Sequence, residues 1–393
     1  MNIVVFEDEG WASMAPITLT RHVSQQVLGT STILEWISKS FGGEVSLAGR
    51  GVVADVASEE TGLKFNVEQK GDVLLINGRL NPTCKLERQR ISERKGFSLS
   101  DPRGSIAIAS LSSQNYEKAL SKDGALSQEE LHRQCRGLEK LSSGANLLFE
   151  YPWEMISCND LAITQSMGAR KRKEPAGVAL SPHADVEENV KFDTRLGPVV
   201  VAEGATIESF SRIAGPAYIG KNSVVHSALV RQGTTISENC RVGGEVDRSI
   251  IYPYTNKAHF GFLGHSILGS WVNMGAGSVT SDLKSTYGTL RVVRGGRRVD
   301  TAMVKLGTIA GDMAKVGSGS IINGGKTLGV SSHVSGLVDK DVPAFLQFDG
   351  RDPEASLALK LESVLDTQSR MMGRRGLEMS RARRKLIESL YAG

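Results

Sequence analysis

The sequence predicts an α/β domain followed by a parallel β-helix and a helical C-terminal tail. Short apolar runs alternate with helical patterns in the first part of the chain. An aliphatic residue then recurs at every sixth position, and near the end leucines and valines fall at helical spacing. These patterns place an α/β domain at 1–165, a basic linker at 166–180, the β-helix at 181–343 and the tail at 344–393.

The first domain has the pattern of a Rossmann-like α/β fold. We expect apolar strands at 3–6, 73–76 and 106–109, with helices at 27–38 and 126–141. Ile33, Leu34 and Ile37 would share one face of the first helix. Strands that alternate with helices favour a mostly parallel sheet.

The six-residue period is the strongest signal in the chain. It runs without a break through Val201, Ile207, Ile213, Ile219 and Val225, and again through Val316, Ile322, Leu328 and Val334. A helix repeats at three to four residues and a half-buried strand at two, so neither explains a step of six. Hexapeptide β-helices have this period. Three hexapeptides close one coil, so residues eighteen apart stack and the aliphatic residue points inward.

Two basic stretches interrupt or flank this repeat. The segment ARKRKEP at 169–175 fits a solvated linker, with an anionic-ligand or targeting patch as the alternative. Residues 281–303 leave the period fully and carry several arginines. Guanidinium groups suit phosphate, so we place Arg294 and Arg297 in coenzyme binding. The alternative is a solvated hairpin.

The tail should contain two helices. Leu357, Leu361, Val364 and Leu365 form an apolar stripe, and a second helix is expected at 377–391. The stripe fits packing on the β-helix or on a neighbouring subunit.

Composition excludes several classes of protein. The net charge of +4 does not by itself indicate nucleic acid. No apolar run reaches the roughly 18 residues of a membrane span, and the N-terminus lacks the pattern of a signal peptide. The four cysteines show no metal-ligand spacing. We expect a cytoplasmic protein with reduced thiols and no membrane or nucleic-acid partner.

The stretch NKAHFGFLGHSILGSWVNMGAGS at 256–278 offers groups for acyl transfer. A base must take the proton of the acceptor amine, and histidine is suited to this near neutral pH. His259 and His265 lie six residues apart, so they project from adjacent walls and do not pair as metal ligands. Asn273 offers an amide, and small residues around Ala276 leave backbone N–H groups accessible. From the residues alone, a histidine here fits a structural role as well as a catalytic one.

At this point the chain resembles a known family. The segments PITLTR, INGRLNPT and NKAHFGFLGHSILGSWVNMGAGSVTSDLK are similar to those of GlmU-related sugar nucleotidyltransferases. Residues 201–340 also resemble the acetyltransferase half of the bifunctional N-acetylglucosamine-1-phosphate uridylyltransferase/glucosamine-1-phosphate acetyltransferase. The likeness covers about residues 1–345. It implies an N-terminal nucleotidyltransferase-like domain, a left-handed β-helix, acetyl-CoA as cosubstrate and a homotrimer.

The resemblance also implies residue roles. His259 falls at the position of the base, Asn273 at a substrate-binding asparagine and Ala276 at a backbone amide that meets the thioester carbonyl. Arg231 matches an arginine that binds the sugar phosphate, and Ser318 a serine on the coenzyme side. Lys257 and Phe262 are placed with the substrate. Phe262 stands where the family has tyrosine, and Asp247 where it has lysine, so the acceptor can differ.

The N-terminal domain departs further from the family. The Gly-rich phosphate loop is replaced by EDEGWASMAPITLTR, whose first basic residue is Arg21. Arg79 replaces a metal-binding aspartate, and we predict that Arg21 and Arg79 contact phosphate instead. A metal position survives at Asn159 or Asp160, with Mg²⁺ as the expected ion. Asp8 is interpreted as a solvated turn residue, with a ligand role as the alternative.

We therefore expect a sugar-phosphate enzyme of nucleotide-sugar biosynthesis. Its β-helix would transfer acetyl from acetyl-CoA to an amino-sugar 1-phosphate, and nucleotidyl transfer would be a further activity of the first domain. One alternative is a sugar-1-phosphate nucleotidyltransferase with a purely structural β-helix. Another is a non-catalytic protein that binds a sugar nucleotide.

Overall fold

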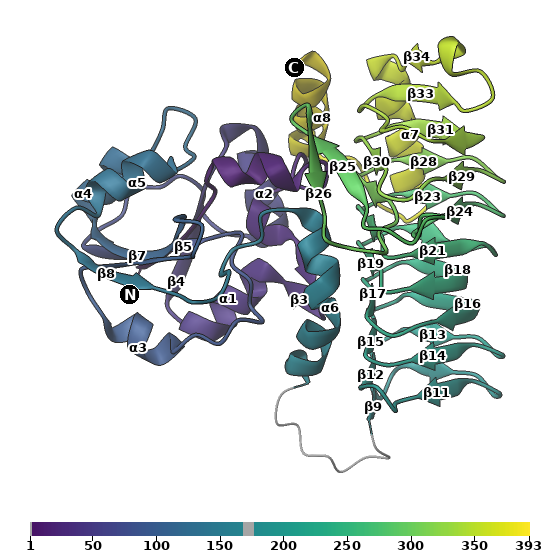
Figure 1. The fold of residues 1–393 in the computed structure, drawn as a ribbon, viewed down its shortest axis with the longest axis horizontal. Coiled ribbons are helices and arrows are strands. Elements are labelled where there is room, and N and C mark those ends of the chain that lie inside the picture. The colour runs from purple at the N-terminus through teal and green to yellow at the C-terminus, as the bar shows by residue number, and fades with distance from the viewer. Residues whose placement is uncertain (1, 168–176) are drawn as a thin grey trace. The chain divides into compact units, whose positions relative to one another are not determined.

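The computed structural model describes residues 2–167 and 177–393 (Figure 1). The predicted linker segment at 169–175 lies outside these residues. The chain divides into two compact units. The first comprises the chain up to Gln26, Ser31–Tyr151 and Met379–Gly393, and the second comprises Val27–Thr30 and Pro152–Glu378.

The first unit contains a six-stranded sheet. Five strands run in one direction, and only the fourth strand of the sheet order runs against its neighbours. The order is β4 (Glu44–Ala48), β1 (Asn2–Phe6), β5 (Asp72–Asn77), β7 (Ile106–Ser112), β6 (Phe97–Ser100) and β8 (Glu139–Ser142). The predicted strands and the mostly parallel sheet are confirmed.

The first unit also contains short helices. They are η1 (Glu9–Met14), η2 (Val23–Gln25), α1 (Ile33–Phe41), α2 (Gly51–Thr61), α3 (Arg88–Glu93), α4 (Ser113–Ala119), α5 (Gln128–Gln134) and α8 (Arg381–Ala392); the short strand β3 (Ser31–Thr32) precedes α1. Thr32 caps α1 with a capping box, so the helix begins at Ile33 and not at 27. The helix predicted at 126–141 is also wrong in extent, because Gly137 adopts a φ of 83° and the chain then forms β8.

The second unit is a parallel β-helix with three walls (Figure 1). Wall 1 consists of β9 (Val178–Leu180), β12 (Val199–Val201), β15 (Ala217–Ile219), β17 (Thr234–Ile236), β19 (Ile250–Ile251), β22 (Ile267–Leu268), β27 (Ile309–Ala310) and β30 (Thr327–Leu328). Val199 pairs with Ala217 and Ile207 with Val225, so residues eighteen apart stack as predicted.

The other two walls share a pair of long strands that turn a corner. Wall 2 holds β10 (Asp185–Val186), β13 (Thr206–Ile207), β20 (Asn256–Lys257), β23 (Asn273–Met274), β28 (Lys315–Val316), β31 (His333–Ser335) and β33 (Leu346–Asp349), which pairs with β34 (Leu357–Ala358). Wall 3 holds β11 (Lys191–Asp193), β14 (Arg212–Ala214), β21 (Phe262–Gly264), β24 (Val279–Thr280), β29 (Ile321–Ile322) and β32 (Leu337–Val338). Both walls include part of β16 (Val224–Val230) and β18 (Arg241–Asp247).

The interior of the β-helix is aliphatic. The predicted six-residue series from Val201 and from Val316 is buried in one core. Helix α6 (Pro152–Ser166) packs on wall 1 near β15, β17 and β22, where the segment containing β2 (Val27–Leu28) also lies. The excursion at 281–303 forms the antiparallel hairpin β25 (Arg291–Arg294) and β26 (Arg297–Asp300).

The C-terminal segment is divided between the units. Helix α7 (Leu361–Gly373), after the short η3 (Pro353–Ala355), belongs to the β-helix unit, and Arg375 beyond it donates to the Asn256 side chain at 2.6 Å. Helix α8 packs on α2 in the first unit, where Leu386 meets Val53 and Val56. Leu357 does not join the predicted helical stripe, because it lies exposed in β34.

Candidate functional site

Three predicted site residues meet at one corner of the β-helix, where wall 2 passes into wall 3. We call this the His259 corner. The Gly277 N–H donates to the Phe260 carbonyl at 2.9 Å, and the Gly319 N–H donates to the Ala276 carbonyl at 2.8 Å. These bonds stack three successive coils, so His259, Ala276 and Ser318 come to the same corner. All three are exposed, as a base, an amide donor and a coenzyme contact would require.

Asn273 lies on wall 2, three residues before Ala276. Its neighbours in register are Asn256 one coil before and Lys315 one coil after. The Lys315 ammonium donates to the carbonyls of Trp271 and Met313 at 3.1 and 2.6 Å, and burial lowers its pKa to about 7. Asn273 itself is half-buried and lies beside the His259 corner.

Lys257 points to the inside of the β-helix. It pairs in register with Val242, an inward-facing core residue, and is only 2% exposed. Its ammonium donates to the carbonyls of Gly243, His259 and Gly261 at 2.8, 2.7 and 3.4 Å. Burial lowers the pKa of Lys257 to about 8. The side chain thus contacts the backbone of the His259 corner from within, and a substrate on the outer surface would not reach it.

Phe262 and Arg231 lie along wall 3. Phe262 pairs in register with Glu245, whose carboxylate accepts from the Arg231 Nε at 2.6 Å. Wall 3 therefore extends from the His259 corner past Phe262 to the guanidinium of Arg231. An acceptor lying along this wall would meet the predicted base at one end and a cation at the other.

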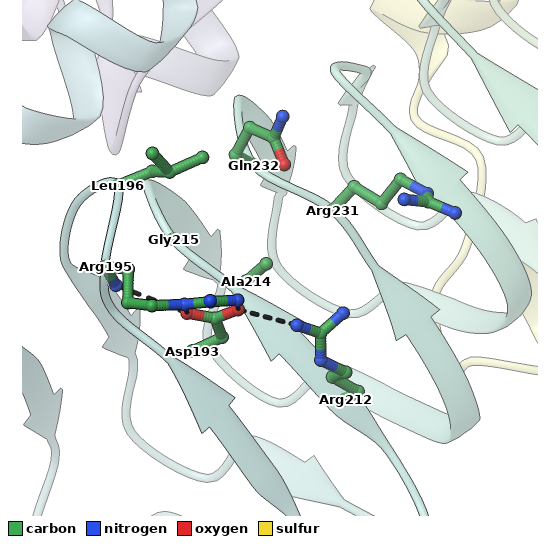
Figure 2. Close-up of a pocket in the computed structure, with 8 residues that line it drawn as sticks. All are labelled: Asp193, Arg195, Leu196, Arg212, Ala214, Gly215, Arg231 and Gln232. Atoms are coloured by element: carbon green, nitrogen blue, oxygen red, sulfur yellow. Dashed lines mark hydrogen bonds and ion pairs between the residues drawn. The ribbon is translucent and has the colours of Figure 1, made fainter.

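A pocket of about 420 Å³ opens beside Arg231 (Figure 2). Its lining residues are Asp193, Arg195, Leu196, Arg212, Ala214, Gly215, Arg231 and Gln232. The Asp193 carboxylate accepts two hydrogen bonds from the Arg195 guanidinium and one from the Arg212 guanidinium. Ala214 pairs in register with Asp193, and its small side chain leaves room for the pocket. Arg231 pairs with Glu245 instead, so three guanidiniums meet two carboxylates around this pocket, and the remaining positive charge suits an anionic group.

The sequence analysis missed the partner of His265. The His265 Nδ1 lies 2.7 Å from the Asp282 carboxylate, and both side chains are 9% exposed. Burial alone would raise the pKa of Asp282, but the hydrogen bond and charge of His265 keep it below its ordinary value. The two residues are one coil apart in sequence, and that separation could have indicated the contact. The pair lies at a corner other than that of His259 and locks the base of the 281–303 excursion.

The two arginines predicted for coenzyme binding differ in environment. Arg294 donates to the Thr327 hydroxyl at 2.9 Å, and its guanidinium lies 5.6 Å from the Trp153 ring centroid. Arg297 is exposed at the hairpin end, next to the turn Gly295–Gly296. Only Arg297 is open to solvent without rearrangement of a packed contact.

In the first unit, two ion pairs fill the carboxyl end of strand β1. Asp8 accepts from Arg79 at 2.8 and 2.5 Å, and Glu7 accepts from Arg50 at 2.9 and 3.0 Å. Both carboxylates are fully buried. The interpretation of Asp8 as a solvated turn residue is therefore wrong. Burial alone would raise the pKa of Asp8, but the charge of Arg79 and its hydrogen bonds hold it below its ordinary value.

Arg79 and Arg21 are almost fully buried as well. Arg79 also donates to the Phe149 carbonyl at 2.8 Å. It would have to leave Asp8 before its guanidinium could contact a phosphate. The open end of parallel strands commonly holds ligands, and in this unit protein side chains occupy that place.

The described residues do not fit a Mg²⁺ site. Within 2–167 and 177–393, no three His, Cys, Asp or Glu side chains are grouped so that they could hold a metal ion. Asp160 lies 3.2 Å from the Arg248 guanidinium, and the Asn159 amide binds the Gly29 backbone and Gly233 carbonyl. Among the same residues, no helix is long and apolar enough to cross a membrane.

Comparison with known proteins supports the predicted resemblance. Residues 3–173 match the family described as sugar nucleotidyl transferase. Over part of its length the chain is similar to GlmU proteins. It is 28% identical over 162 residues to the bifunctional protein GlmU of Picosynechococcus sp., which covers 39% of this chain and 32% of that protein.

Two further matches are a curated relative and a solved structure. The bifunctional sugar-1-phosphate nucleotidylyltransferase/acetyltransferase of Sulfurisphaera tokodaii is 28% identical over 206 residues, 49% of this chain and 45% of the relative. A putative acetyltransferase structure from Bacillus cereus covers 53% of this chain and 96% of its own at 16% identity, with a TM-score of 0.27. The chain spans about a third of the length of the Picosynechococcus relative and somewhat less than half of the Sulfurisphaera relative.

Proposed function

We propose that this chain is a transferase that moves an acetyl group from acetyl-CoA to the amino group of a phosphate-bearing sugar. The observation that carries the proposal is the His259 corner, where His259, Ala276 and Ser318 from three coils converge at the surface. The relatives support the choice of reaction, since two of them are named as bifunctional proteins, and the name of one of these two includes acetyltransferase.

The proposed reaction assigns one task to each residue. The acceptor nitrogen attacks the thioester carbonyl carbon, and the neutral His259 imidazole takes the proton that the nitrogen loses. The Ala276 N–H donates to the oxygen that becomes negative. When the carbon–sulfur bond breaks, the proton returns to the coenzyme sulfur, and an amide and a free thiol remain. Asn273 orients the sugar, and Ser318 and Arg297 bind the coenzyme.

The pocket beside Arg231 is the proposed place of the phosphate. It lies on wall 3, and its three arginines outnumber the two carboxylates that pair with them, which leaves a net positive charge for a phosphate. Phe262, with no hydroxyl, contributes an apolar contact to the sugar. Lys257, which lies inside the β-helix, would act on the corner and not on the acceptor.

The test is acetyl-CoA turnover with glucosamine-1-phosphate. Replacing His259 with Ala should lower kcat by roughly 10²–10⁴-fold, the usual contribution of a positioned base, with little change in acetyl-CoA affinity. His226→Ala is the matched control, because His226 is a half-buried histidine on the β16 strand, paired with Glu208. Full activity of the His259 variant would refute the proposed base.

We further propose a homotrimer in the cytoplasm. The outer face of wall 3 supports self-association, because Ile321 and Leu337 are neighbours in register and about half exposed. Light scattering tests this, and a monomer would remove any site shared between subunits.

Nucleotidyl transfer by the first unit is the second candidate. The family match over residues 3–173 favours it. The buried Asp8–Arg79 and Glu7–Arg50 pairs weigh against it, as does the lack of a fitting Mg²⁺ site among the described residues. Nucleotide binding by the isolated protein, measured by calorimetry with UTP and dTTP, separates this candidate from a purely structural first unit.

A further inference from the structure

One inward-facing position of the β-helix holds a charged residue in place of an aliphatic one. Lys257 follows Val242 in the same interior column. Asn256 pairs in register with Asn273, so Met274 comes next, and Val316 and Val334 continue the column in later coils. These neighbours are buried hydrophobic residues. An apolar side chain would pack there without the cost of burying an ammonium. The charge therefore needs an explanation beyond packing.

The ammonium has a full set of acceptors. Lysine carries three donors, and three carbonyls lie within hydrogen-bond distance, those of Gly243, His259 and Gly261. Hydrogen bonds from a charged donor are stronger than neutral ones. Two of the three carbonyls belong to the turn at 259–261, so the lysine ties that turn to the coil before it.

The turn at 259–261 depends on these hydrogen bonds because its backbone conformation is unusual. Gly261 has a φ of 140°, a region that residues with a side chain rarely adopt. A Cβ at this position would lie 2.2 Å from the Ser278 carbonyl oxygen. His259 itself is exposed and projects from the turn. The position of its imidazole thus depends on how firmly the backbone of this turn is held.

We propose that Lys257 is a positioning residue, whose ammonium fixes the turn at 259–261 from inside the β-helix and so holds His259 in place for catalysis. The part that concerns catalysis rests on the proposed role of His259 as the base. The part that concerns the turn does not depend on that role and can be tested without turnover.

The test uses Lys257→Met in the full chain, because methionine matches Met274 in the next coil and keeps the column filled. Amide hydrogen exchange is measured at residues 258–262. We expect exchange there to become at least roughly tenfold faster, since local opening governs exchange. Lys315→Met is the matched control. Lys315 donates to the carbonyls of Trp271 and Met313, so its replacement should affect amide exchange near those two residues and leave the exchange rates at 258–262 unchanged.

The second arm is steady-state kinetics with acetyl-CoA and glucosamine-1-phosphate. We expect kcat of Lys257→Met to fall roughly 10–100-fold, because a misplacement of about 1 Å can have an effect of that size, while KM for acetyl-CoA stays unchanged. A lysine that serves stability alone would leave kcat of the folded variant unchanged. Lys257→Gln, whose amide supplies two donors, should recover part of both effects and serves if the methionine variant does not fold.

The outcomes separate the two proposals. Unchanged exchange at 258–262 in both Lys257 variants overturns the fastening of the turn, whatever the kinetics show. Faster exchange with an unchanged kcat overturns the catalytic part. An inactive wild type, or a fully active His259→Ala variant, defeats the proposed function, and faster exchange in Lys257→Met would still support the fastening of the turn.

Discussion

Replacing Asp8 with Ala should destabilise the first unit strongly. In the wild type the Asp8 carboxylate accepts from Arg79 Nε at 2.8 Å and from Arg79 Nη2 at 2.5 Å. It also accepts from the side chains of Gln128 at 2.7 Å and Asn77 at 2.8 Å. The variant leaves a guanidinium that is 6% exposed without its counter-ion. Breaking a buried pair in this way costs about 3–5 kcal/mol.

The measurement is amide hydrogen exchange in strand β1 at increasing urea concentrations, which reports the free energy of unfolding of the first unit alone. Asp72→Ala is the matched control, since Asp72 pairs with Lys95 at the surface of the same unit, where 52% and 80% of the two side chains are exposed. Exposed pairs contribute little, so this control should unfold like the wild type.

The pH dependence provides a second check on Asp8. Its pKa in the folded protein lies below the ordinary value of 3.8. The stabilisation is therefore present above the unfolded-state pKa and is lost as the pH falls through the lower, folded-state pKa. A loss below about 1 kcal/mol in Asp8→Ala at pH 7 would contradict the reasoning, because the burial penalty of an unpaired charge exceeds it. Such a result would mean that Arg79 finds another partner or reaches water.

Two further predictions concern the β-helix. His265→Ala should lower the free energy of unfolding by about 1–3 kcal/mol, because Asp282 then loses a buried partner. The kcat of the folded variant should stay the same. Lost turnover at unchanged stability would instead assign the role of the base to His265. Lys257 should make stability rise with pH between about 8 and its ordinary pKa of 10.5, because the unfolded chain binds more protons there. This lowering of the pKa from 10.5 to about 8 corresponds to roughly 3 kcal/mol. The measurement is the difference in unfolding free energy between wild type and Lys257→Met, and a difference that does not change with pH would contradict the prediction.

The period of the sequence predicted more of the fold than its composition did. The aliphatic series at every sixth position placed the β-helix core residue by residue, because a fixed inward direction in each coil leaves no freedom of register. The same series shows which way Lys257 points. Ile251, Lys257 and Leu263 are six residues apart, so the step alone indicates an interior lysine, a signal that its assignment to the substrate overlooked.

The sequence predicted the structure of the first unit less completely. Its strands were found, but the antiparallel direction of β7 and the short α5 were not. Local apolar runs do not specify the direction of a strand, which depends on the connections and on the faces to be covered. The predicted roles of His259, Asn273, Ala276, Arg231 and Ser318 came from family resemblance and remain predictions.

The sequence by itself determined the six-residue step of the β-helix, which side chains fill it and where the hairpin leaves it. Tertiary structure alone decided the partners of the charged residues. Asp8 and Arg79 are 71 residues apart, and they meet because β1 and β5 are neighbours in the sheet. An acidic residue in a turn is solvated in most proteins. Here the strand order places a guanidinium beside it, and a buried charge is tolerated only where such a partner is within reach.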